Sequence, residues 1–189
     1  ACRCVATELY DSGVITRLNE GTKNLNIGAP SVVIVSYTNV AVSNIKSALP
    51  DEFKRNCMTV HKLLEFQPHW YLDVDAEGNT VKRMEYIPKY GAAGEKLPNI
   101  THCIIEESGT VPKWLYDELA AALPDDCTFI YLGDLEQLPP AFDDGILGFK
   151  LVEHEERIVR LHEVYRQALK SPIINLAHRI LKGTPIGDA

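Results

Sequence analysis

Acidic and amide side chains follow two apolar runs of this sequence, in an arrangement that suits phosphate chemistry. Glu106 and Glu107 come directly after one run, and Asp134 and Gln137 follow the other. Successive residues of an extended chain point in opposite directions, so adjacent carboxylates can take different roles. One can hold Mg²⁺, usually through its water shell, while the other orients or deprotonates an attacking water. A glutamine on the neighbouring strand can sense the γ-phosphate, so this set is typical of nucleotide hydrolysis.

A third apolar run, residues 33–35, ends in hydroxyl and amide groups. The side chains that follow it are Ser36, Tyr37, Thr38 and Asn39. Taken singly, these features have plain structural explanations, since Thr and Asn often cap helices. Three apolar runs that all end in polar side chains favour a shared site, because the carboxyl ends of parallel strands lie at one edge of a sheet.

Apolar runs alternate with helical patterns along the chain and predict the elements that position these side chains. Strands are expected at 31–36, 58–60, 102–105, 128–132 and 159–161, and helices at 40–49, 61–66, 112–123 and 172–181. The strands are continuously apolar rather than alternating, which indicates burial on both faces and a parallel sheet. We therefore expect a doubly wound α/β domain whose ligands bind at the carboxyl ends of its strands.

One stretch does not follow this plan. Residues 70–74 and 80–86 have strand character and flank the turn-prone sequence DAEGN at 75–79. This pattern predicts a β-hairpin inserted into the parallel α/β domain.

Bulk composition limits the function classes. The chain has 189 residues, of which 46% are hydrophobic, enough for one core or one core with a small appendage. Its net charge of −7 argues against a nonspecific polyanion binder but leaves a local nucleic-acid groove open. No apolar run approaches the ~20 residues that cross a bilayer. The start does not resemble a signal peptide, so we expect a soluble, intracellular protein. The five cysteines form no zinc pattern and are expected to be reduced thiols.

Five short stretches, in order along the chain, resemble motifs of superfamily-1 helicases. They are VSYTNVAV (motif Ia), TVHKLL (motif Ib), CIIEES (Walker B), GDLEQLPP (motif III) and LHEVYRQ (motif IV). The sequence looks most like the RecD and Dda group, which moves along single-stranded DNA. The resemblance implies a RecA-like P-loop NTPase fold, with a mostly parallel sheet and helices on both faces. It also implies an ATP-dependent DNA helicase, in which DNA-stimulated ATP hydrolysis is coupled to strand separation in the cytoplasm of a bacterial cell or phage-infected host.

Carried over position by position, the resemblance implies roles for the polar residues. Glu106 takes the place of the Mg²⁺ ligand, and Glu107 that of the catalytic base. Asp134 and Gln137 belong to the nucleotide-binding loop, where Gln137 couples the γ-phosphate to the DNA-binding surface. Arg166 takes the place of an arginine finger. ATP and Mg²⁺ are the implied cofactors.

The resemblance also implies a nucleic-acid surface. Thr38, Asn39 and His61 take the places of residues that contact the single-strand backbone. Hydroxyl and amide groups beside a helix start suit phosphate contact without base preference. In the RecD and Dda group a β-hairpin pin is inserted between motif Ib and Walker B, and we expect Trp70 and Tyr86 of the predicted hairpin to act in strand separation. The implied partners are single-stranded DNA, duplex junctions and a second motor domain in the same polypeptide.

These comparisons predict a domain plan. Residues 1–67 and 98–165 are expected to form the first motor domain, 68–97 the pin, and 166–189 the start of the connection to the second motor domain.

The sequence departs from the family pattern at three places. Glu106 stands where the family usually has Asp, and Tyr37 stands where motif Ia generally has Pro. No GxxxxGK[ST] occurs, so the amide cradle and lysine for the phosphates are missing. In the family, the helix after the P-loop precedes motif Ia, and ACRCVATELY stands there. We therefore expect the P-loop to end immediately before Ala1, and the isolated chain to be inactive. A true loss, with a dead ATPase, is the rival explanation.

Other function classes compete with a motor. A non-hydrolysing nucleic-acid-binding module derived from a helicase fold predicts salt-sensitive strand binding without ATPase activity. A glycosidase is disfavoured because its acid and its nucleophile must stand at separated positions on either side of one bond. Glu106 and Glu107 are instead adjacent in the sequence. A nuclease is disfavoured because no compact Asp/Glu/His metal cluster is evident.

Overall fold

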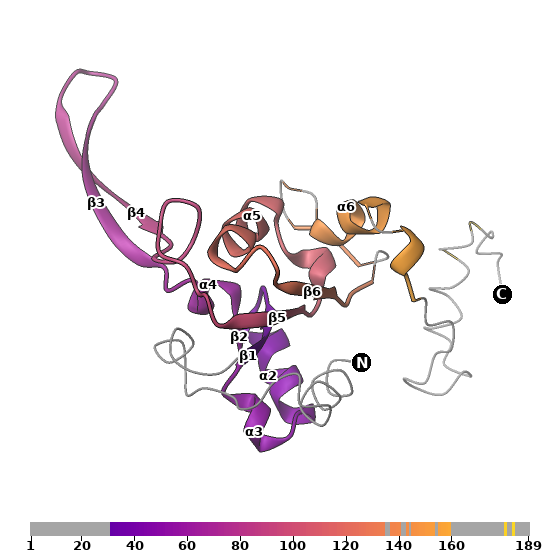
Figure 1. Cartoon of the computed structure of the whole chain (residues 1–189). Coiled ribbons are helices and arrows are strands. Elements are labelled where there is room, and N and C mark those ends of the chain that lie inside the picture. Colours follow the sequence, from indigo (N-terminus) through magenta and orange to yellow (C-terminus); the bar gives the residue numbers. More distant parts are fainter. Residues whose placement is uncertain are drawn as a thin grey trace. The chain divides into compact units, whose positions relative to one another are not determined.

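The computed structural model describes residues 31–134, 137–140, 143, 145–153, 155–159, 180 and 183 (Figure 1). The chain divides into two compact units, 1–154 and 155–189, and nearly all described residues belong to the first. The elements are β1 (Ser31–Ser36), α2 (Asn39–Ala48), α3 (Asp51–Lys54), β2 (Cys57–Thr59), α4 (Val60–Leu63), β3 (Gln67–Val74), β4 (Thr80–Ile87), β5 (Ile100–Ile105), the 3-10 turn η2 (Ser108–Thr110), α5 (Lys113–Ala122), β6 (Thr128–Tyr131), α6 (Ile146–Glu153) and η3 (Glu155–Arg157).

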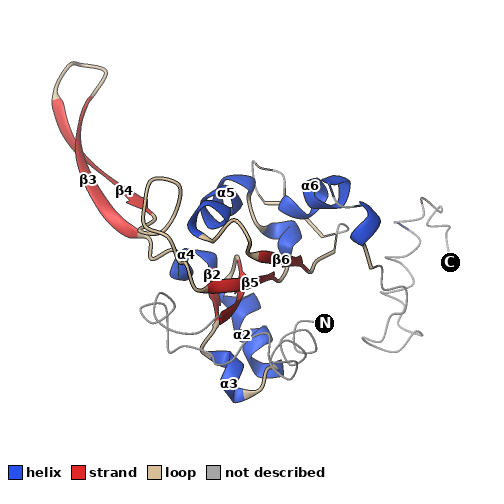
Figure 2. Cartoon of the chain, viewed as in Figure 1, coloured by secondary structure: helices blue, strands red, loops and turns tan. Residues whose placement is uncertain are grey.

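Four strands form a parallel sheet in the order β2-β1-β5-β6. Figure 2 draws the strands of the sheet and of the hairpin in red. Every residue of β1 is buried, as its unbroken apolar pattern predicts. Val35 pairs with Met58 on one side and with Ile105 on the other, so β1 lies inside the sheet. The predicted parallel sheet is confirmed.

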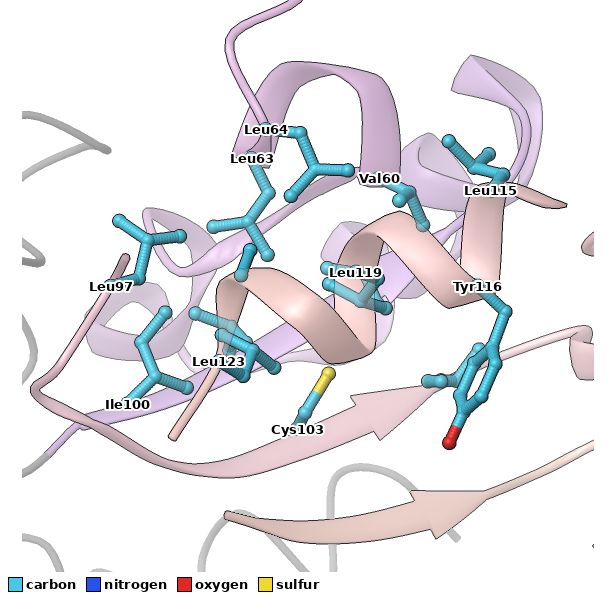
Figure 3. Packing of buried hydrophobic residues seen from close by; sticks show 14 of the residues in the cluster. Val60, Leu63, Leu64, Leu97, Ile100, Cys103, Leu115, Tyr116, Leu119 and Leu123 are labelled. Carbon is cyan, nitrogen blue, oxygen red and sulfur yellow. The ribbon is translucent and has the colours of Figure 1, made fainter. Parts of the chain in front are cut away.

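Alternate residues of β1 pack against different helices. Val33 and Val35 belong to one buried cluster with side chains of α4 and α5, including Leu63 and Leu119. Figure 3 shows this side of the core, where Leu115 and Leu119 of α5 lie among Val60, Leu63 and Cys103. Val32 and Ile34 belong to a second cluster with Val42 of α2 and Phe53 beside it in α3. Helices therefore cover both faces of the sheet, as predicted.

The inserted hairpin is present and longer than predicted. β3 and β4 are antiparallel, with eight residue pairs from Gln67↔Ile87 to Val74↔Thr80. Asp75 fixes the turn: its Oδ1 accepts the backbone amides of Asn79 (2.7 Å) and Glu77 (3.1 Å). These bonds hold the pKa of the Asp75 carboxyl below its ordinary value, and the bond from the Asn79 amide has the largest effect. Gly78 takes the left-handed φ of 85° that closes the turn.

The remaining element predictions have mixed outcomes. The helices and strands predicted between residues 31 and 132 are present, with ends shifted by up to three residues. The short elements α3, η2, α6 and η3 were not predicted. Val159, the one described residue of the predicted strand 159–161, does not lie in a strand. The predicted helix at 172–181 lies outside the described residues except for Ile180, which is helical.

Two further observations concern the cysteines and the length of the apolar helices. Cys57, Cys103 and Cys127 are free thiols buried in the core. In the part of the chain that the structure describes, no helix has the length and apolar character needed to span a bilayer.

Candidate functional site

The chain turns sharply at Glu106 and Glu107, directly after β5. The amide of Glu106 donates to the carbonyl of Val35 (2.8 Å), which continues the pairing of β5 with β1 by one residue. Glu107 then adopts a left-handed conformation, with φ 53° and ψ 41°. The amide and hydroxyl of Thr110 both donate to the Glu107 carbonyl (2.9 and 2.8 Å) and hold this turn. A left-handed non-glycine residue costs about 1–3 kcal/mol, and such conformations concentrate at functional sites.

The loop after β5 is tied directly to the loop after β6. The amide and hydroxyl of Ser108 both donate to the carbonyl of Leu132 (2.9 and 3.0 Å). Gly133 permits this approach, because a Cβ there would lie 2.9 Å from Ser108 Oγ. A Cβ on Gly109 would similarly lie 3.1 Å from the carbonyl oxygen of Asp134. The two loops thus form one backbone unit, which we call the acidic edge (residues 106–109 and 132–134).

The acidic edge brings together three predicted site residues, and a fourth lies next to it. Glu106 and Glu107 directly follow β5, and Asp134 follows β6 in the adjoining loop. The amide of Gln137 lies 3.4 Å from the carbonyl oxygen of Asp134, so Gln137 adjoins the acidic edge. Arg166 lies outside the described residues.

The donor chemistry of the acidic edge fits a magnesium nucleotide. Among the described residues, no three His, Cys, Asp or Glu side chains are grouped so as to hold a metal ion. Mg²⁺ is ordinarily held by one or two carboxylates, with water and substrate phosphates completing its coordination. Glu106 and Glu107 supply carboxylates of this kind at a strand end.

The start of α2 contains two of the predicted nucleic-acid contacts. Thr38 is the N-cap, and its Oγ1 accepts the amide of Ala41 (3.1 Å). This bond leaves the hydroxyl proton of Thr38 available to donate. Asn39 is the first residue of α2, and both side chains are exposed.

The third predicted contact, His61, lies within a group of aromatic rings that was not predicted from the sequence. Its ring centroid lies 5.0 Å from Phe66, 5.7 Å from Tyr37 and 6.2 Å from Trp114. We call these four residues the aromatic cluster. Burial lowers the pKa of His61 from its ordinary value of 6.5, which favours the neutral imidazole. Sequence signals for the cluster were weak: Tyr37 departs from the family pattern, and Trp114 is an apolar residue on the exposed side of α5.

Trp70 and Tyr86 lie on the same face of the hairpin. Trp70 pairs with Met84 and Pro68 with Tyr86, and directly opposed or next-but-one residues share a face. This apolar face consists of Pro68, Trp70, Leu72, Val74, Thr80, Lys82, Met84 and Tyr86. Its Trp70 and Tyr86 are 55% and 61% exposed, and Lys82 Nζ lies 4.7 Å from the centre of the Trp70 ring. The opposite face carries the ion pair between Arg83 and Asp73 (2.7 Å).

Comparisons with known proteins place the chain in a family. A family model described as an AAA domain (AAA_19) matches residues 12–143, which is more than half of the chain. The ATP-dependent RecD2 DNA helicase of Deinococcus radiodurans is 30% identical over 114 residues, or 58% of this chain. The chain corresponds to only 16% of that protein's length. Together with the parallel sheet and inserted hairpin, these matches show that the chain belongs to the AAA_19 family of AAA domains, and they support its resemblance to RecD-like superfamily-1 helicases.

Proposed function

We propose that the chain is part of the first motor domain of an ATP-dependent DNA helicase. The observation that carries this proposal is the pair of hydrogen bonds from Ser108 to Leu132, which join the two polar strand ends. A rigid acidic edge is what catalysis by positioning and electrostatics requires in phosphoryl transfer.

Within this proposal each predicted site residue has a task. Glu106 holds the metal through its carboxylate, and Glu107 orients and deprotonates the attacking water. Asp134 and Gln137 contact the phosphates of the nucleotide, and Gln137 couples the γ-phosphate to the DNA-binding surface. Arg166 neutralises the negative charge that develops on the phosphates during transfer. Bound Mg²⁺ and ATP supply the electrophilic phosphorus and the charge that these groups act upon.

The nucleic acid is single-stranded DNA entering from a duplex junction. Thr38 and Asn39 donate to phosphate oxygens at the start of α2, with His61 beside them. Trp70 and Tyr86 act where the strands separate. We place the protein in the cytoplasm, and a second motor domain in the same polypeptide is its proposed partner. Among the described residues, β6 is the last strand on its side of the sheet.

The test is ATP turnover of the longer protein with and without single-stranded DNA. Glu107→Gln is expected to reduce turnover by roughly 10²–10⁴-fold, the usual contribution of general-base help. ATP binding should persist, because the amide preserves the shape of the side chain. The matched control is Glu77→Gln, the same change at an exposed position in the hairpin turn, which should preserve turnover.

Turnover of Glu107→Gln within a few-fold of the unmodified protein would reject the role of Glu107. DNA binding without any ATPase activity in the unmodified longer protein would instead favour the non-hydrolysing module.

A further inference from the structure

The aromatic cluster is assembled from segments that follow three different strands. Tyr37 directly follows β1, His61 lies in α4 after β2, and Trp114 lies in the first turn of α5, beyond β5. Phe66 lies between α4 and β3 and is also 6.4 Å from Trp114. The cluster therefore lies at the carboxyl end of the sheet, adjoins Thr38, and ends where the hairpin begins.

Trp114 is exposed in a place where packing does not require it. The inward side of α5 is formed by Leu115, Tyr116, Leu119 and Ala122, all buried. Trp114 lies on the other side and is 49% exposed. Its contacts with His61 and Phe66 hold one part of the indole, and the remainder is accessible to a planar ligand. Nucleobases stack on such rings with little sequence preference.

The charges around Trp114 permit a polyanion to approach. Asp117, one turn along α5, is paired with Lys113 (2.7 Å). Glu118 accepts the backbone amide of Ala92 (2.9 Å). Near Phe66, the carboxylate of Glu65 lies 3.5 Å from the ammonium of Lys89. The neighbouring carboxylates are thus engaged, and exposed Lys62 follows His61.

We propose that the aromatic cluster is a base-stacking site for single-stranded DNA and that Trp114 is its contact residue. The inference rests on the proposed helicase function and extends it from the phosphates to the bases. Thr38 and Asn39 hold the backbone, while Trp114 holds the base. Because Phe66 immediately precedes β3, a strand released at the hairpin meets this site first.

Binding of oligothymidylate by the 189-residue chain provides the test, with an abasic strand of equal length as the second probe. A strand of about 12 nucleotides lies within typical site sizes. Trp114→Ala is expected to raise the Kd for oligothymidylate by roughly 5- to 100-fold, the range of one lost base stack. The Kd for the abasic strand, which has phosphates but no bases, should stay unchanged. Trp114→Phe should restore most of the affinity, and Val152→Ala, an 84% exposed position on α6, is the matched control.

A second measurement leaves Trp114 in place. The chain has two tryptophans, so Trp114 is the sole one in Trp70→Phe. Oligothymidylate should quench its fluorescence, and the abasic strand should not. Equal weakening of both probes by Trp114→Ala, or equal binding of both by the unmodified chain, would overturn the stacking site and leave single-strand binding intact. Binding of neither probe would overturn both the stacking site and the proposed nucleic-acid function of the chain.

Discussion

The acidic edge and the hairpin are held in opposite ways. Backbone hydrogen bonds from Glu106 to Val35, from Leu132 to Ile105, and from Ser108 to Leu132 fix the acidic edge from several sides. The hairpin is held by its own ladder and at its root, where the amides of Lys89 and Tyr90 both donate to the carbonyl of Leu64 (3.0 and 3.1 Å). Chemistry at a phosphate requires fixed positions, whereas contact with a large partner requires exposed surface. The contrast indicates that substitutions in the two regions will affect different steps.

The largest effect is expected at Arg166, the proposed arginine finger, which lies outside the described residues. Arg166→Ala should reduce DNA-stimulated ATP turnover of the longer protein by about 10³–10⁵-fold, the contribution typical of arginine fingers. Single-turnover kinetics with saturating ATP would measure this. Arg166→Lys keeps the charge but loses the planar fork, so it should recover only part of the rate. Turnover within a few-fold of the unmodified protein would remove Arg166 from the site.

A smaller but still large effect is expected from Gly133, where the two loops approach most closely. Gly133→Ala places a Cβ 2.9 Å from Ser108 Oγ and 3.2 Å from the Ser108 backbone nitrogen. The loops must separate, which should lower the free energy of unfolding by about 1–3 kcal/mol and reduce ATP turnover. Urea unfolding and ATPase assays report the two quantities. Gly148→Ala is the control, because nothing lies within 4 Å of the added Cβ; equal loss there would contradict the close-approach argument.

On the hairpin, the expected effect is confined to unwinding. Trp70→Ala and Tyr86→Ala should slow strand separation several-fold and leave DNA-stimulated ATP turnover unchanged, because both side chains are exposed on the apolar face. A duplex-unwinding assay run beside the ATPase assay separates these outcomes. Tyr71→Ala is the matched control, since Tyr71 is 37% exposed on the opposite face. Parallel loss of unwinding and turnover in the Trp70 or Tyr86 variant would argue against a separate pin.

The smallest effect is a pH dependence of stability from His61. Burial lowers its folded-state pKa below the ordinary 6.5, so the unfolded chain binds the proton more readily. The stabilisation is complete above pH 6.5 and is lost as the pH falls through the folded-state pKa. Denaturant unfolding between pH 7.5 and pH 5 should show this decline, and His61→Phe should reduce it. Some decline will remain, because burial also lowers the pKa of His102. An unchanged pH profile in His61→Phe would contradict the burial of the imidazole.

Local patterns in the sequence were sufficient for the sheet, since the apolar runs of β1 and β5 are buried on both faces by the core clusters. The turn chemistry of residues 75–79 was equally sufficient for the hairpin. The left-handed backbone of Glu107 was not predictable, because a glutamate carries no local preference for it. The aromatic cluster was not predictable either, because its rings come together only through the order of the strands. α6 was missed since its sequence, ILGFKLVE, has the composition of a strand as much as of a helix.

Because the hairpin is long, a small rotation at its root moves its turn by a large distance. Eight residues at about 3.4 Å each extend ~27 Å from root to turn. A rotation of roughly 10° at the Leu64 anchor would therefore shift the turn by about 5 Å, which exceeds the ~3.4 Å rise of a nucleotide step. A slight tilt in the packing of α4 would thus move the hairpin turn by more than the distance between neighbouring base pairs.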